Sequence, residues 1–189
     1  AVGSGQTDKD QSKNIDGIIL LINKNEKSFL SKQIDIGQWD LIRNLELNKE
    51  NGIYLSGALS LYNHNFVAIK NSKIHHNFAD DGLNIKNAEV QISQNQFYLN
   101  AADQFDLDTG TGYVTNNIFS GSSDKLNNMN FLSVKLDTNG DGLDLSDSKI
   151  IVNNNMFEGF VDKGISIGEN TKAFVFKNIF KNNRSAITA

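Results

Sequence analysis

The chain of 189 residues contains no cysteine and no proline. Without cysteine the protein has no disulfide, no thiolate zinc site and no catalytic thiol. Without proline, every backbone N–H can take part in a ladder of hydrogen-bonded strands. Arginine is scarce as well, since it occurs only at Arg43 and Arg184. These absences exclude several kinds of chemistry and are compatible with a fold built from strands.

The sequence also lacks a basic surface and a long apolar run. Its formal net charge is -4 at pH 7, whereas nucleic-acid-binding domains are normally basic. The longest apolar run, from Ile18 to Ile22, is far shorter than the roughly 20 residues that cross a bilayer as a helix. Residues 1–14 lack the apolar core of a signal peptide. We therefore expect no nucleic-acid partner and no membrane insertion.

What the sequence does contain is a short cassette that recurs. The letters DGLDL at 141–145 return as KGISI at 163–167, and a third start appears at 186–188. The interval from Leu143 to Ile165 is 22 residues, as is that from Leu83 to Phe105, while Phe105 and Leu143 are 38 residues apart. The longer interval is one period plus an insertion. A period in the low twenties predicts a solenoid, in which each repeat buries its apolar face by stacking on its neighbours.

Each repeat contains two or three short stretches that alternate apolar and polar residues. Examples are Leu83 with Ile85 and Val90 with Ile92, separated by Asn, Gly, Asp and Ser. Alternation of this kind is typical of strands, and the separating residues are typical of turns. The leucine-rich repeat has a similar period, but its Leu-x-x-Leu-x-Leu framework is absent. The sequence therefore predicts an all-β solenoid, a parallel β-helix with about 22 residues per coil.

The chain divides into three regions by this pattern. Residues 1–14 are polar and aperiodic, so we expect a disordered tail. Residues 15–56 are apolar but keep no 22-residue period, which favours an irregular N-terminal capping region. Residues 57–189 carry the coils, with an insertion near 120–136. Because the chain stops as another coil begins, we expect further β-helix coils or another subunit to cover an apolar end formed by Phe174, Phe176, Ile179 and Phe180.

Asparagine is frequent where the strands end. Its side chain bonds to local backbone and tolerates left-handed turns. When such residues stack coil over coil, their amides hydrogen-bond along the axis. We expect structural asparagine ladders built from Asn71, Asn77, Asn95, Asn100, Asn117, Asn155, Asn178 and Asn183.

The cassettes resemble the bacterial right-handed parallel β-helix repeat proteins of the pectate-lyase-like superfamily. The resemblance covers the chain from about Gly57 onward and implies a right-handed coil. It rests on DGLNI at 81–85, DGLDLS at 141–146, DKGISIGE at 162–169 and the Asn-x-Phe turns at Asn95 and Asn155. Relatives of this architecture include polysaccharide lyases, hydrolases, epimerases, sugar-binding modules and adhesins. The resemblance therefore implies a fold and an association with glycans, but no single activity.

Outward-pointing residues carry whatever chemistry such a coil has. In Leu143-Asp144-Leu145, strand alternation turns Asp144 outward. Coils lie about 4.8 Å apart, so stacked carboxylates repel unless one is protonated, a cation is shared or the insertion separates them. An acidic groove for Ca²⁺ or a sugar is the functional interpretation, and a solvated polar face is the structural one. The candidate carbohydrate-binding residues are Asn84, Asp106, Asp108, Asp144 and Ser166.

The segment DTNGDG at 137–142 has the opening pattern of calcium-binding loops. The pattern departs at its twelfth position, where Ser148 stands in place of a bidentate glutamate. We interpret the segment as a tight turn that returns the insertion to the coils. The alternative is a Ca²⁺ site formed by Asp137, Asn139, Asp141 and Asp144.

Two functions remain open. Enzymes of the resembled superfamily rely on a Lys, Arg or His base, or carry an Asp-Asp pair with further motifs of which only Asp80-Asp81 is present here. Scarce arginine and histidine favour a non-catalytic secreted, periplasmic or cell-surface β-helix, part of a longer protein, that binds a polysaccharide or another surface polymer. The alternative is a Ca²⁺-dependent polysaccharide lyase or related carbohydrate-active enzyme that uses Asp106, Asp108 and Asp144.

Overall fold

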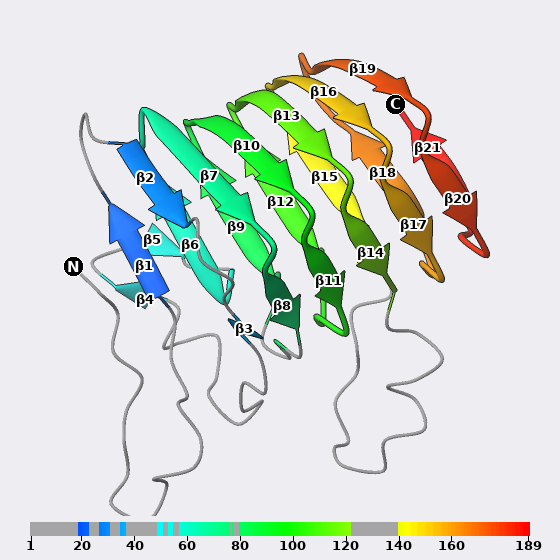
Figure 1. Cartoon of the computed structure of the whole chain (residues 1–189), viewed down its shortest axis with the longest axis horizontal. Coiled ribbons are helices and arrows are strands. Elements are labelled where there is room, and N and C mark those ends of the chain that lie inside the picture. Colours follow the sequence, from blue (N-terminus) through cyan, green and yellow to red (C-terminus); the bar gives the residue numbers. More distant parts are fainter. Residues whose placement is uncertain are drawn as a thin grey trace, which may run out of the picture.

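A computed structural model describes residues 19–22, 27–30, 35–36, 49–50, 53–54, 57–75, 77, 80–121 and 140–189. These residues form strands and turns, and none of them forms a helix. The described part of the chain thus has no helix long and apolar enough to cross a membrane. The strands stack in successive layers along one long axis (Figure 1).

Three parallel sheets run along that axis. The seven-stranded sheet has the order β1 (Ile19–Ile22), β6 (Leu59–Tyr62), β9 (Leu83–Lys86), β12 (Phe105–Asp108), β15 (Leu143–Ser146), β18 (Lys163–Ile167) and β21 (Ser185–Thr188). The second sheet has the order β2 (Lys27–Leu30), β7 (Phe66–Lys70), β10 (Glu89–Ser93), β13 (Thr111–Thr115), β16 (Lys149–Asn153) and β19 (Lys172–Phe176). The third has the order β3 (Asp35–Ile36), β8 (Lys73–His75), β11 (Gln96–Tyr98), β14 (Ile118–Ser120), β17 (Met156–Glu158) and β20 (Ile179–Lys181).

The register of these sheets confirms the parallel β-helix predicted from the 22-residue period. Leu83 pairs with Phe105, and Leu143 pairs with Ile165, in parallel strands. Phe105 pairs with Leu143 across the longer interval of the sequence. The insertion between β14 and β15 therefore leaves β12 and β15 as direct neighbours.

Residues 15–56 contain more of the solenoid than an irregular cap would. Strands β1, β2 and β3 pair in parallel with β6, β7 and β8. Within the described part of this region, β4 (Lys49–Glu50) and β5 (Ile53–Tyr54) form a separate antiparallel pair. Ile19 pairs with Leu59, and because that interval is much longer than one period, the spacing of the sequence does not reveal this coil. Residues 1–14, predicted to be disordered, lie outside the described part of the chain.

The interior is filled by rows of apolar side chains, one from each coil. Leu83, Phe105, Leu143 and Ile165 are all fully buried, as the alternation predicts. Burying a side chain of this size contributes on the order of 1.5–3 kcal/mol. The row holds the strands of the seven-stranded sheet in fixed register and so determines which residues face outward.

A second interior row consists of stacked phenylalanine rings. The ring centroids of Phe97 and Phe119 are 4.9 Å apart, and those of Phe119 and Phe157 are 4.7 Å apart. Phe180 continues the stack at 5.2 Å from Phe157. Such offset aromatic pairs stabilise a core beyond their buried area.

Close approach of coils explains the glycine that opens the cassettes. A Cβ atom at Gly142 would come within 2.5 Å of the carbonyl oxygen of Gly164 and within 2.7 Å of a ring carbon of Phe157. Contacts this short require that the residue have no side chain. The glycine therefore lets the chain enter each strand of the seven-stranded sheet directly over the next coil.

An asparagine ladder follows the turn between the second and third sheets. The Oδ1 of Asn117 accepts hydrogen bonds from the backbone N–H and the Nδ2 of Asn95, both at 3.0 Å. The Nδ2 of Asn117 donates to the Oδ1 of Asn155 at 3.0 Å, and Asn155 donates likewise to Asn178. Asn71, also expected in a ladder, is instead an exposed turn residue with a φ of 53°.

A second stack of amides lies at the next turn. The backbone N–H of Asn77 donates to the Oδ1 of Asn100 at 3.1 Å. Farther along the axis, the Oδ1 of Asn183 accepts from the N–H of Phe160 at 3.0 Å. Side-chain amides therefore tie neighbouring coils together at more than one corner of the solenoid.

Candidate functional site

The predicted outward residues form one row on the seven-stranded sheet, one residue from each coil. A second row follows two residues further along each strand and contains Lys86 and Asp108, which pair with each other. We call the first set the outer row, and it consists of Ser60, Asn84, Asp106, Asp144, Ser166 and Thr188.

Exposure is uneven along the outer row. Asn84 is fully buried, while Asp106, Asp144 and Ser166 are partly exposed and Thr188 is exposed. The expectation that Asn84 faces solvent is therefore wrong. Gly57 lies against it, since a Cβ there would come within 2.7 Å of the Asn84 nitrogen. Strand alternation determines that a side chain leaves the interior, but not that nothing covers it.

Two carboxyl groups lie side by side in the outer row, because Asp106 and Asp144 are paired residues of neighbouring strands. The Nδ2 of Asn84 donates a hydrogen bond to Oδ2 of Asp106. Burial, aided by the nearby charge of Asp108, raises the pKa of Asp106 to about 7. Burial also raises the pKa of Asp144. The insertion does not separate the two groups, and Asp106 relieves the repulsion by holding a proton near neutral pH.

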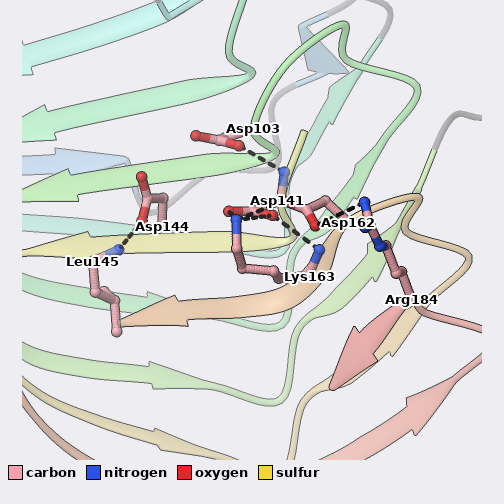
Figure 2. A network of polar contacts seen from close by, with 7 residues as sticks. All are labelled: Asp103, Asp141, Asp144, Leu145, Asp162, Lys163 and Arg184. Carbon is pink, nitrogen blue, oxygen red and sulfur yellow. Dashed lines mark hydrogen bonds and ion pairs between the residues drawn. The ribbon is translucent and has the colours of Figure 1, made fainter. Parts of the chain in front are cut away.

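Several other oxygens of this face have partners within the protein. The Oδ1 of Asp144 accepts the N–H of Leu145 at 2.9 Å (Figure 2), and the side chain of Ser166 also hydrogen-bonds to Asp144. Lys86 places its Nζ 2.5 Å from Oδ2 of Asp108. Burial acts to lower the pKa of Lys86, but Asp108 outweighs it and the pKa is raised. Lys86 is therefore a permanent ammonium group at the edge of the outer row.

Beside the outer row lies a line of stacked aspartates, which we call the aspartate ladder: Asp81, Asp103 and Asp141. The Oδ1 of Asp81 accepts the N–H of Asp103 at 3.1 Å, and the Oδ1 of Asp103 accepts the N–H of Asp141 at 2.6 Å (Figure 2). The Oδ1 of Asp141 accepts the N–H of Lys163 at 3.0 Å. Each carboxyl group thus bonds to the backbone of the next coil.

The pKa values of Asp103 and Asp141 in the aspartate ladder are raised, and the last carboxyl group of the ladder pairs with Lys163. Burial and the charge of Asp81 raise the pKa of Asp103 to about 9. At the far end, Nζ of Lys163 lies 3.1 Å from Oδ2 of Asp141 and 2.6 Å from Oδ2 of Asp162. Burial nevertheless outweighs Lys163 and raises the pKa of Asp141. Arg184 stands 3.9 Å from Asp162 and is mostly exposed.

Sequence reasoning considered Asp81 only as part of the Asp80-Asp81 pair and did not single out Asp103 or Lys163 as members of a site. The signal was present, because the residue before each glycine or glutamine that opens a coil recurs at the same intervals as the core leucines. A repeat of polar residues directly before the buried strand marks side chains that can reach the backbone of the neighbouring coil.

The predicted calcium loop is described only in part. Asp137 and Asn139 lie outside the described residues, while Asp141 bonds to Lys163 and Asp144 bonds to Leu145 and Ser166. Among the residues that the structure describes, no three His, Asp or Glu side chains are grouped so as to hold a metal ion. Asp141 therefore joins coils, whatever the segment before it does.

Residues 41–189 match the family model of the right-handed beta helix region. The chain belongs to the right-handed β-helix family. Comparison with curated proteins and comparison with solved structures gave no match. Membership of the family establishes the fold and its hand, while the ligand has to be argued from the site.

This right-handed β-helix also carries apolar side chains on its outside, which the sequence analysis assigned to the end of the last coil. Phe174 is 73% exposed and Tyr113 is 50% exposed, and both lie on the outward side of the second sheet. Phe176 and Ile179 are exposed as well, whereas Phe180 points inward and joins the phenylalanine stack.

Proposed function

We propose that this right-handed β-helix binds a carbohydrate or similar surface polymer along the outer row, without transforming it. The observation that carries the proposal is the periodicity of the row. Asp106, Asp144, Ser166 and Thr188 present one polar side chain from each successive coil, and paired strands lie about 4.8 Å apart. A polymer of repeating units that runs along the axis meets a hydrogen-bonding group at every coil.

The surroundings of the row favour binding over catalysis. The carboxylate of Asp108 is paired with Lys86, and that of Asp144 accepts bonds from Leu145 and Ser166. The described histidines lie elsewhere, because His64 sits in the turn between β6 and β7, and His75 stacks on Tyr98 in the third sheet. The same proposal places the protein outside the cytoplasm, secreted, periplasmic or at the cell surface, where structural glycans occur.

One observation favours a second candidate, a polysaccharide lyase or related carbohydrate-active enzyme, Ca²⁺-dependent as in the alternative drawn from the sequence. Asp106 has a pKa of about 7 and lies next to Asp144. A carboxyl group that titrates near neutral pH can give or take a proton during glycan cleavage, and a second carboxyl group beside it is the usual arrangement in enzymes that cleave glycans by acid–base chemistry.

A single screen separates the two candidates. Neutral, uronic and amino glycans are tested with the whole chain, with and without Ca²⁺, and are read for binding, for new reducing ends and for unsaturated product. We expect binding without product, weakened in Asp106→Asn and unchanged in Glu89→Gln, an exposed acid on the second sheet. Product that disappears in Asp106→Asn would establish the enzyme instead, and an absence of binding to every glycan would contradict the proposal.

A further inference from the structure

We propose that the polymer bound on the outer row is cationic, an amino-sugar polymer whose protonated amines bind between Asp106 and Asp144. This inference rests on the proposed function and names its ligand class. It follows from the hydrogen-bonding character of the groups in the row, from the position of the protein's own ammonium groups, and from the sign of the charge.

The centre of the outer row is short of hydrogen-bond donors. Asn84 is fully buried, and its Oδ1 is a buried side-chain atom with no hydrogen-bond partner in the described part of the chain. The same amide group contacts Asp106 through its Nδ2. A buried acceptor without a donor destabilises a folded protein. An amine that donates to Asp106, the hydrogen-bond partner of this amide, would add a donor to the network.

Ammonium groups of the protein form ion pairs with other carboxylates on this face. Lys86 binds Asp108 on one side of the row, and Lys163 binds Asp141 and Asp162 on the other. Asp106 and Asp144 lie between these two lysines along the axis and make no ion pair with any described residue. Asp106 and Asp144 are therefore flanked by examples of the group that we expect them to bind.

The sign and geometry of the site discriminate between ligand classes. An ammonium group offers three donors and no acceptor, which matches a row made of carboxyl and amide oxygens. A uronic-acid polymer would bring carboxylates against Asp106, Asp108 and Asp144, and repulsion of like charges at this distance rejects a ligand. A metal ion is disfavoured, because the described acids are not grouped as a set of three ligands.

Binding of an amine should also release the proton that Asp106 holds in the free protein. Asp106 holds a proton near neutrality because it is buried and close to Asp108. A positive charge within about 4–6 Å favours the ionised form of a carboxyl group. The amine therefore replaces the proton that relieves the repulsion in the free protein.

The test compares three oligosaccharides of equal length by titration calorimetry at low salt and at a pH where the amine is protonated. Glucosamine oligomers carry the amines, N-acetylglucosamine oligomers have the same backbone without charge, and oligogalacturonate is anionic. We expect the glucosamine oligomers to bind most tightly and oligogalacturonate not to bind. Added salt should weaken the complex, since the attraction is between charges near the surface.

Variants of the outer row test where the glucosamine oligomers bind. Asp106→Asn and Asp144→Asn should each weaken glucosamine binding by about tenfold, the loss expected for one charge-assisted hydrogen bond. Glu89→Gln and Phe174→Ser should leave it unchanged, because both residues are exposed on the second sheet. Melting curves check folding, and should Asp106→Asn not fold, Asp144→Asn and the salt dependence carry the test.

The outcomes separate this inference from the proposed function. Acetylated or anionic oligomers that bind more tightly than glucosamine, with a dependence on Asp106, would overturn the cationic ligand and leave glycan binding intact. Glucosamine binding that survives both aspartate variants but is lost in Phe174→Ser would assign it to apolar adsorption and overturn the inference. Failure of all three oligomers to bind would contradict both.

Discussion

Two ladders run along this solenoid, and they solve the same problem with different chemistry. In the asparagine ladder, Oδ1 of Asn117 accepts the backbone N–H of Asn95 in the preceding coil. In the aspartate ladder, Oδ1 of Asp103 accepts the backbone N–H of Asp141 in the following coil. Both join coils through a side-chain oxygen and a main-chain donor, although they point in opposite directions along the axis.

The difference lies in what the rest of each side chain can do. The amide of Asn117 also donates, to Oδ1 of Asn155 and to the carbonyl of Ile92, so the rung is satisfied and uncharged. A carboxylate has no donor, and each added rung brings another negative charge. Burial together with the charge of Asp81 raises the pKa of Asp103 to about 9, and the ladder ends on the ammonium of Lys163.

Amide stacking is therefore a sufficient way to hold coils together, and the acids require another explanation. The solenoid concentrates carboxyl groups on one edge of the seven-stranded sheet, in the aspartate ladder and in the outer row beside it. Stacked asparagines would join the coils there without repulsion. The acids also accept backbone N–H groups of the next coil, so the acidic edge is compatible with the cationic polymer that we propose.

The largest expected loss of stability comes from placing an aspartate in the asparagine ladder. Asn117→Asp places a buried carboxylate in the asparagine ladder and removes two donors, to Asn155 and to Ile92. Leaving buried groups unpaired and burying a charge should lower the free energy of unfolding by about 3 kcal/mol or more at neutral pH. Chemical denaturation measures the change, with Asn65→Asp at an exposed turn position as the matched control.

The loss in Asn117→Asp should shrink as the pH falls, because the new carboxyl group then takes up a proton and regains a donor. A variant as stable as the wild type at neutral pH would show that the amide stack contributes little. A loss of equal size in Asn65→Asp would point to general charge and not to the ladder.

Placing an asparagine in the aspartate ladder should instead stabilise the protein as the pH rises. Folding raises the pKa of Asp103 from the usual value of about 4 to about 9. The folded state therefore binds one more proton across this window, and the free energy of unfolding falls as the pH rises, by about 1.4 kcal/mol per pH unit for each such proton. Asp103→Asn keeps the oxygen that accepts the N–H of Asp141 and removes this dependence.

Denaturation curves between about pH 4 and pH 9 measure the two slopes. We expect Asp103→Asn to gain stability over the wild type as the pH rises, and to differ least at the acid end. Asp147→Asn, at a turn where the aspartate accepts a hydrogen bond from Asn170, should leave the slope unchanged. Parallel curves for Asp103→Asn and the wild type would mean that Asp103 is ionised in the folded protein.

The ladders also show how far the sequence predicts this molecule. The buried row of Leu83, Phe105 and Leu143 was predictable because apolar spacing and alternation are direct consequences of stacking. The burial of Asn84 was not, because alternation says which way a side chain points and nothing about what crosses over it. The coil that contains β1 was missed since its interval to the next coil differs from the period.

The candidate site was predicted in part for the same reason. The register placed Asp106 beside Asp144 correctly, because every residue of a strand shares the register of its buried neighbours. The raised pKa of Asp106 depends on burial and on Asp108 together. The repeat spacing specifies neither the burial of Asp106 nor its distance from Asp108. The contact of Lys163 with Asp141 and Asp162 depends on a side-chain conformation, which a repeat pattern does not specify.

The smallest expected effect concerns the cation that ends the aspartate ladder. Lys163→Met retains most of the apolar stem and removes the ammonium that lies 3.1 Å from Asp141 and 2.6 Å from Asp162. The ion pairs are partly exposed, so the loss should be about 1–2 kcal/mol, between the values of surface and buried pairs. Because burial already raises the pKa of Asp141 and the variant removes a neighbouring cation, the loss should grow as the pH rises and Asp141 ionises, and it should be smallest where Asp141 is protonated. Arg184→Ala is the matched control, since this mostly exposed cation stands 3.9 Å from Asp162, and it should change the stability by less than about 0.5 kcal/mol. Equal losses in the two variants, or a loss in Lys163→Met that does not depend on pH, would show that the lysine acts through packing alone and that the ladder needs no cation at its end.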